Sequence, residues 1–221
     1  MTGSQPRPPF RRAAAAGLWI LLLAGLPWGC EQSPPSEAPE TARTRDSAPA
    51  SAPTPPGDAA IRLTDVTEAS GLDMRLTSGV LPPSQILEVK GGGLALLDYD
   101  GDGDLDVFVP NGATLEQPDR GPGARLYAQV GPLRFRDVTD EAAINHQRWS
   151  MGVNVVDVDA DGWPDLYLSC YGPNVLLRNR GDGTFADVTA EWGVGVEGWS
   201  SSAAFADVDG DTDLDLYVAN Y

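Results

Sequence analysis

The sequence has few of the residues on which most enzymes and nucleic-acid-binding proteins depend. Its 221 residues include one histidine, two cysteines and 15 basic side chains against 32 acidic ones, a net charge of −17 at pH 7. Proteins that bind phosphate backbones need a basic face, and no cluster of basic residues is available to form one. GxSxG and HExxH motifs and a Cys–His pair are also missing. We therefore expect a protein that binds no nucleic acid and is not an enzyme, in which the one histidine, His146, is a polar surface residue.

Residues 1–29 have the character of a signal peptide. Three arginines precede an apolar run over residues 13–25, which is the order of charged and apolar regions in exported proteins. Gly29 and Cys30 resemble the end of the lipobox of bacterial lipoproteins, in which the cysteine is diacylated and becomes the mature N-terminus. Ordinary cleavage and an uncleaved anchor stay open as alternatives, because the apolar stretch is borderline for spanning a bilayer. We expect an exported protein with lipidated Cys30.

Residues 30–58 are expected to form a disordered tether. Of the 28 residues from Glu31 to Asp58, 19 are Pro, Ala, Ser or Thr, and none is aromatic or a branched apolar residue. Such a segment cannot bury a core and instead holds the downstream residues away from a membrane surface. If Cys30 is acylated, Cys170 has no disulfide partner, and its place in the run DLYLSC predicts a small buried strand residue.

The remaining residues, 59–221, repeat themselves. Three acidic segments align: DYDGDGDLD at 98–106, DVDADGWPD at 157–165 and DVDGDTDLD at 207–215. A phrase containing DVT recurs from Leu63, Phe135 and Phe185. Trp149 and Trp199 each stand eight residues before an acidic segment, which favours a shared packing role over a role in ligand binding. A period of roughly fifty residues indicates a repeat architecture and suits the four short strands of one propeller blade.

The middle repeat predicts four antiparallel strands. The expected strands cover residues 152–156, 166–170, 174–178 and 184–188, with turn-forming glycines between the later ones. The acidic segment joins the first two strands. Helix-like pieces are confined to the residues after DVT, so the expected fold class is all-β. Arg178, at the end of the third strand, is expected to support its own blade.

The acidic segments predict calcium sites, because each places aspartates at positions 1, 3, 5 and 9. Alternate spacing turns successive carboxylates toward one centre, and the backbone carbonyl at position 7 adds a further oxygen. The candidate ligands are Asp98, Asp100, Asp102, Asp104 and Asp106; Asp157, Asp159, Asp161, Trp163 and Asp165; and Asp207, Asp209, Asp211, Asp213 and Asp215. Calcium accepts six to eight such oxygens, whereas magnesium needs a tighter octahedron.

An EF-hand shares the opening DxDxDG phrase but requires a glutamate at position 12. Here position 12 is Val109, Leu168 or Val218, and the flanking segments are strands rather than helices. EF-hands are therefore excluded. The third segment differs from the others because Thr212 stands at position 6, where they have glycine. If that position needs a positive φ, a β-branched residue is strained there.

These motifs resemble the FG-GAP or VCBS repeat family of calcium-loop β-propeller blades, and more closely the bacterial relatives of cartilage acidic protein, which carry an ASPIC/UnbV domain after the propeller. The residues that carry the resemblance are 91–112, 174–193 and 203–221. The resemblance implies a ring of about seven blades with calcium on the twelve aspartates at positions 1, 3, 5 and 9. About two and a half blades are present, so we expect an N-terminal fragment, with Leu63–Val66 as the strand that closes the ring.

The expected function is that of a non-enzymatic, calcium-binding propeller tethered to the cell envelope, on its periplasmic or outer-surface side, or secreted. It would present a surface to a protein or glycan partner that the sequence does not identify, and would touch a membrane only through its N-terminal lipid or anchor. The alternative is the propeller part of an extracellular carbohydrate-active enzyme whose catalytic residues are not identifiable. A calcium buffer ranks last, because three sites are few for that task.

Overall fold

A computed structural model describes residues 63–89 and 91–221 of the chain. The predicted signal peptide (1–29), Cys30, the whole of the predicted tether (30–58) and residues 59–62 lie outside the described residues. Within the described ranges, no helix has the length and apolar character needed to cross a membrane.

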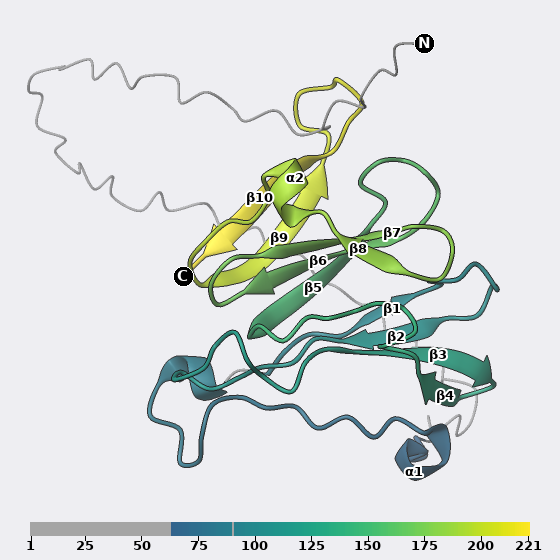
Figure 1. Ribbon diagram of the computed structural model, residues 1–221, viewed down its shortest axis with the longest axis vertical. Coiled ribbons are helices and arrows are strands. Elements are labelled where there is room, and N and C mark those ends of the chain that lie inside the picture. The colour runs from purple at the N-terminus through teal and green to yellow at the C-terminus, as the bar shows by residue number, and fades with distance from the viewer. Residues whose placement is uncertain (1–62, 90) are drawn as a thin grey trace, which may run out of the picture. The chain divides into compact units, whose positions relative to one another are not determined.

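Ten strands form three antiparallel sheets in the described part of the chain (Figure 1). The first sheet contains β1 (Ala95–Leu97), β2 (Asp106–Val109), β3 (Arg125–Gly131) and β4 (Arg134–Asp137). The second contains β5 (Ser150–Val156), β6 (Asp165–Cys170), β7 (Val175–Asn179) and β8 (Phe185–Asp187). The third contains β9 (Ser200–Ala206) and β10 (Asp215–Asn220). The predicted all-β class is confirmed, and the strands of the middle repeat lie within two residues of their expected positions.

The helices are short and two of them follow DVT phrases, as expected. They are α1 (Thr67–Ser70), the 3-10 helix η1 (Ile86–Val89) and α2 (Thr189–Trp192). In the second sheet, Asp187 Oδ1 accepts the Thr189 N–H at 3.0 Å, and the Thr189 hydroxyl accepts the Leu176 N–H at 2.8 Å. Thr139 makes the equivalent contacts in the first sheet. The phrase recurs because its aspartate forms a turn and its threonine binds the start of the third strand.

The middle sheet is buried on both faces, and β6 shows how. Leu166 and Leu168 face the first sheet in a core that includes Phe108. Tyr167, between them, faces the third sheet and packs edge-on against Phe205 with ring centroids 5.5 Å apart. Side chains alternate along a strand, so a strand covered on both sides must be apolar throughout. This explains the continuous LYLSC run.

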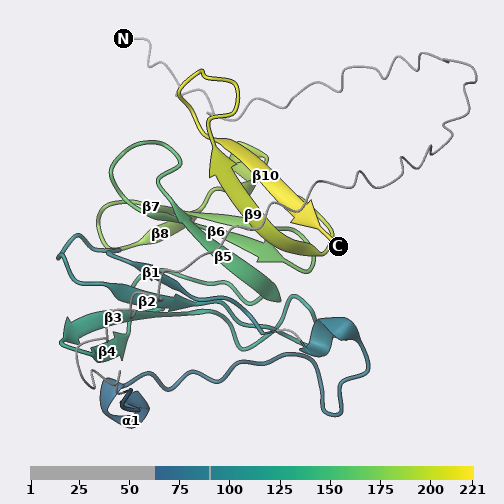
Figure 2. The same ribbon diagram turned by 180° about the vertical axis from the view of Figure 1, so that it is seen from behind.

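The innermost strands of the three sheets, β1, β5 and β9, pack beside one another (Figure 2). The first two approach closely, since a Cβ placed on Gly93 would lie 3.6 Å from the Cα of Gly152. Asn154 on β5 donates to the Ala203 carbonyl on β9 at 3.1 Å. Successive sheets that share an inner edge and extend outward are the blades of a β-propeller. The ring is not closed within the described residues.

His146 is buried, so its prediction as a surface residue was wrong. Only 6% of it is exposed, and its Nε2 lies 2.6 Å from the Ser150 hydroxyl. Ser150 in turn lies 3.5 Å from Cys170 Sγ, and Cys170 is a free, fully buried cysteine as expected. The polar neighbours in the sequence were misleading, because Asn145 and Gln147 are exposed while the imidazole turns inward to a hydroxyl.

Trp149 confirms the predicted packing role. It is 1% exposed, lies in a cluster with Leu87 and Met151, and packs edge-on against Tyr171. Trp199 packs against the same cluster.

The segment 63–66, expected to close a ring, forms no strand and leads into α1. A strand forms only against an edge, and the blade that it was expected to complete is not among the described residues.

Candidate metal centres

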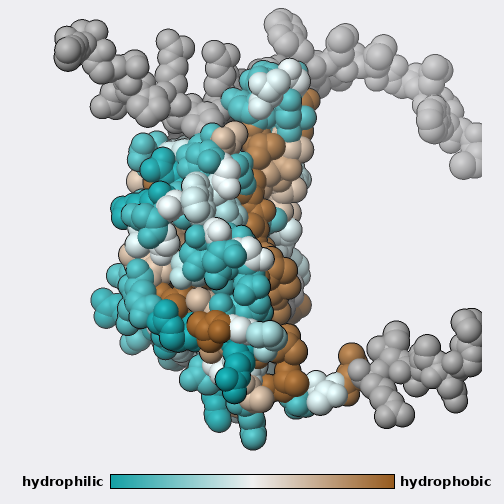
Figure 3. All heavy atoms as spheres, turned by 90° about the vertical axis from the view of Figure 1, so that its right-hand side faces the viewer, coloured by the Kyte–Doolittle hydropathy of each residue, from teal (hydrophilic) through white to brown (hydrophobic). Residues whose placement is uncertain are grey.

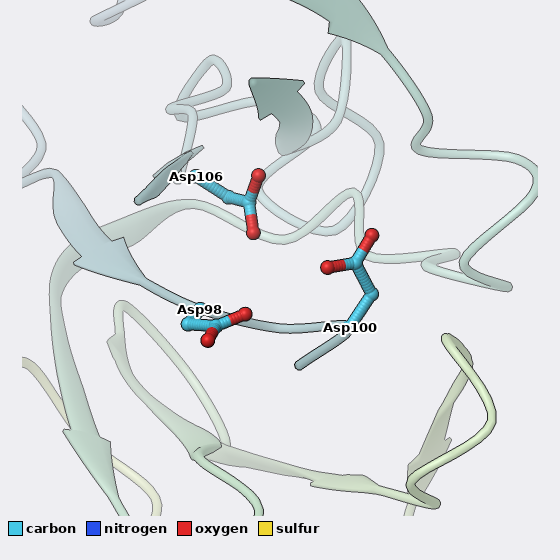
Figure 4. Close-up of side chains that lie close together, drawn as sticks. All are labelled: Asp98, Asp100 and Asp106. Atoms are coloured by element: carbon cyan, nitrogen blue, oxygen red, sulfur yellow. The ribbon is translucent and has the colours of Figure 1, made fainter. Parts of the chain in front are cut away.

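Each acidic loop brings three carboxylates together. They come from positions 1, 3 and 9, and in each group one oxygen per residue lies within 4.8 Å of the others. The groups are Asp98, Asp100 and Asp106; Asp157, Asp159 and Asp165; and Asp207, Asp209 and Asp215. Figure 4 shows the first group, in which the three carboxylates converge on one space. The same geometry recurs at the same place in all three blades, between the first and second strands.

The loops are wound around the carboxylate at position 1. Asp98 accepts the N–H groups of Gly101 and Gly103, at 2.8 and 3.0 Å. Positions 4 and 6 adopt left-handed conformations in every loop, which lets successive amides turn toward that carboxylate. Position 6 has φ values of +90° and +91° at Gly103 and Gly162 but +77° at Thr212. The strain expected for a β-branched residue at this position is therefore present in the third loop.

The carboxylate at position 9 ties its loop to the third strand of the blade. Asp165 is fully buried and accepts two backbone N–H groups, from Val158 in the loop at 3.0 Å and from Asn179 on β7 at 2.7 Å. Asp106 accepts the equivalent pair in the first blade. An aspartate here therefore holds loop and sheet together, in addition to its place in the triad.

Positions 5 and 7 are arranged differently from the triads. Asp102, Asp161 and Asp211, at position 5, belong to none of the groups found among the described residues, and each accepts the N–H of position 7. Position 7 was predicted to contribute a backbone carbonyl, and its side chains vary. A Cβ built on Gly101 would lie 2.8 Å from the Trp163 ring, and one built on Gly181 would lie 2.5 Å from its Nε1, so Trp163 packs across the first loop and a nearby turn.

Burial and mutual repulsion disfavour the charged form of several loop carboxylates. Desolvation raises the pKa of Asp165 to about 7, opposed by its two backbone hydrogen bonds. Desolvation, followed in size by the nearby Asp161, also raises the pKa of Asp159. A hydrogen bond with Asp211 raises the pKa of Asp213 to about 6. A bound cation would reverse these shifts by favouring the charged form of each triad member.

The donors suit a hard cation. All three triads consist of oxygen ligands, which calcium and magnesium prefer, and no soft sulfur or imidazole takes part. In the second loop, Asp159 Oδ1 is buried and has no hydrogen-bond partner. A buried carboxylate oxygen without a partner is costly, and an ion at the centre of the triad would satisfy it.

Two residues near the second triad were not recognised as site residues from the sequence. Asn179, fully buried, donates its side-chain N–H to the Tyr99 carbonyl in the first loop at 2.8 Å, so it links the two blades. Arg178 Nη1 lies 3.6 Å from Asp159 Oδ2, within its own blade as expected but beside the metal ligands. Both residues stand at the end of β7, just before the RGDG turn, and nothing in the local sequence indicates that they lie near an acidic loop.

Comparison with known proteins identifies the family to which the chain belongs. A model described as FG-GAP-like repeat matches residues 98–168 and 157–218, which together span more than half of the chain. Each matched region begins at an acidic loop and includes the strands after it. No curated protein matches the chain. Repeat architecture, blade structure and recurring acidic loops agree with this match, and the chain belongs to the FG-GAP-like repeat family.

Proposed function

We propose that this protein is a calcium-stabilised, non-enzymatic β-propeller that is held outside the cell and presents a surface to a protein or glycan partner. The observation that carries the proposal is the threefold recurrence of the carboxylate triad at one place in successive blades. A single acidic turn on a soluble protein needs no metal. Here the triad occurs three times, and in each loop the position-9 aspartate accepts a backbone N–H of the loop. One triad also contains a buried carboxylate oxygen without a hydrogen-bond partner. Together these features favour a bound cation.

Calcium is the cation that the loops favour. Positions 1, 3 and 9 offer three carboxylates, and the position-7 carbonyl and water can bring the number of oxygens to the six to eight that calcium takes. The ion would have a structural role, because position 9 is bonded to both the loop and the third strand. Asp98, Asp157 and Asp207 would hold the ion with their triad partners and at the same time order the loop amides.

Further blades are part of the proposal, and equivalent residues support them. Phe108 and Tyr167 occupy the same position of successive blades, and each is fully buried against the next blade. Tyr217, the equivalent residue in the third blade, is 73% exposed. Exposed hydrophobic residues also gather along one side of the molecule in Figure 3. We therefore propose that the sequence is part of a longer propeller, in which another blade covers Tyr217, and that it is related to proteins with an ASPIC/UnbV domain.

The absence of enzymatic activity is also a proposal, and the chemistry of the buried polar cluster supports it. Desolvation raises the pKa of the Cys170 thiol to about 11 and lowers the pKa of His146 to about 4. The thiolate that a nucleophile requires is therefore disfavoured at neutral pH. These residues resemble a catalytic Cys–His pair in composition only. A carbohydrate-active enzyme that keeps its catalytic groups in other blades is the alternative.

Attachment to the cell envelope depends on the N-terminal segment. The signal peptide, Cys30 and the tether of residues 30–58 support a lipoprotein whose propeller stands off a membrane. Replacing Cys30 by alanine should release the protein from the membrane fraction. Attachment that persists in this variant would contradict lipidation and favour an uncleaved anchor.

The calcium proposal is tested by thermal melting of the purified chain in calcium, in magnesium and in chelator. With calcium at one to ten times its dissociation constant, each site adds about 0.4–1.4 kcal/mol, so calcium should raise the Tm by several degrees. Asp157→Asn should reduce the shift, whereas Glu116→Gln, an exposed acid outside the loops, should leave it unchanged. Equal melting in calcium and chelator, together with no bound metal by elemental analysis, would refute the proposal.

A further inference from the structure

The second metal centre differs from the first by an arginine beside its ligands. Among the described residues, four ion pairs are formed, and the pair of Arg178 with Asp159 is the one that reaches a carboxylate triad. Arg178 lies on β7, one residue before Asn179, which pairs with Phe185. The residue in the same register on β3 is Ala128. The first blade therefore offers no basic side chain at this position.

In the first blade, an arginine stands on the neighbouring strand and pairs with another residue. Arg136 on β4 pairs with Ala128 in register, and its guanidinium binds Glu141 at 2.6 Å. In the second blade, Ala186 stands at that place on β8 and Arg178 faces it from β7. The exchange of arginine and alanine between the two strands gives one triad an ion pair with arginine and leaves the other without one.

The two oxygens of Asp159 have different environments. Oδ2 lies 3.6 Å from Arg178 Nη1, while Oδ1 is buried and has no hydrogen-bond partner. The side chain of Asp159 is 21% exposed and that of Arg178 is 39% exposed, so solvent screens the pair only in part. One oxygen of this ligand is thus shared with a fixed cation, and the other is free to bind an ion.

A calcium ion in the triad would be repelled by the guanidinium charge of Arg178. An ion about 2.4 Å from Asp159 Oδ1 lies within about 8 Å of Arg178 Nη1. Even at the dielectric constant of water, the repulsion between a divalent and a monovalent cation at that distance corresponds to roughly a five- to tenfold loss of affinity. When no ion is bound, the same guanidinium offsets part of the repulsion among Asp157, Asp159 and Asp165.

We propose that Arg178 is a built-in counter-cation of the second acidic loop, which makes this site bind calcium more weakly than the first and preserves the loop when calcium is absent. The inference rests on the proposed function, because it assumes that the triads bind calcium. It assigns the blades different roles: the first loop stays loaded at low calcium, while the second releases its ion first and loses less structure on release.

The test is a calcium titration of the full chain by calorimetry, with Arg178→Gln as the variant. Glutamine removes the charge and keeps a polar, shorter side chain. We expect the affinity of one site to rise about five- to tenfold and the Tm in chelator to fall. Arg136→Gln, which removes the arginine of the first blade from its Glu141 pair, should leave every calcium affinity unchanged.

Asp159→Asn identifies the site that responds. In this background the second site has lost a carboxylate ligand and should no longer give a resolved binding step, so Arg178→Gln should raise no affinity. An unchanged or lower affinity in Arg178→Gln overturns the inference, and a lower affinity would mean that Arg178 positions Asp159 for the ion. A wild-type chain that binds no calcium in the titration instead contradicts the proposed function itself, so the two failures are distinguishable.

Discussion

Replacing Thr212 by glycine should stabilise the third loop. Thr212 has a φ of +77°, at the position where the first two loops have glycine at about +90°. A left-handed residue with a Cβ costs about 1–2 kcal/mol. Glycine would remove this cost but would give back about 0.4–1 kcal/mol, because it makes the unfolded chain more flexible. The backbone N–H that Thr212 donates to Asp207 Oδ2 at 3.0 Å is kept in the variant.

The expected net gain is about 0.5–1 kcal/mol, which corresponds to an increase of about 1–4 °C in Tm for a domain of this size. Thermal melting in chelator measures it without a contribution from bound calcium. Gly162→Thr, at the same position of the second loop, is the reverse change and should lower the Tm. If Thr212→Gly lowers the Tm while Gly162→Thr does not, the strain assigned to this position does not exist.

Three other perturbations test the blade contacts and the electrostatics of the loops. Asn179→Ala removes a buried hydrogen bond to Tyr99 between blades and should cost about 1–3 kcal/mol in urea unfolding, whereas an effect below about 0.5 kcal/mol would show that the contact is not made. Asp165 has a pKa of about 7 in the folded protein, against an ordinary value of 3.8. In chelator, its contribution to stability is therefore full below about pH 4 and is lost as the pH rises toward 7, by up to about 1.4 kcal/mol per pH unit. Calcium should reverse this trend, and a stability in chelator that rises with pH over this window would contradict the shift. Tyr167→Ala should cost about 3–5 kcal/mol and Tyr217→Ala, at the equivalent but exposed position, almost nothing; equal losses would mean that another surface already covers Tyr217.

Much of the fold could be predicted from the sequence, because the blade is encoded locally. Alternating apolar residues, glycine turns and the DVT phrase place the strands of the middle repeat within two residues of those observed. The recurrence of each phrase at a fixed spacing shows that the same unit is built again. The spacing of the aspartates also placed positions 1, 3 and 9 at one centre, since that depends on loop geometry alone.

Contacts between blades could not be predicted in this way. His146 looked like a surface residue because its neighbours are polar, yet its environment depends on a hydroxyl four residues away and a cysteine on another strand. Arg178 and Asn179 stand at the end of β7, and their roles depend on which loop the packing brings near them. Position 5 stays a predicted ligand: it belongs to none of the triads among the described residues, and one of its oxygens accepts the amide of position 7.

The sequence by itself determined the repeat, the all-β class and the three acidic loops, because strand alternation, turn residues and ligand spacing act over a few residues. Only the tertiary structure decided which distant residues the loops contact. Arg178 reaches one triad and Tyr99 is bound across a blade interface, because these contacts join residues that are 19 and 80 positions apart. Burial is also decided by the tertiary structure: desolvation by the packed blades, which no local pattern records, raises the pKa of Asp165 to about 7.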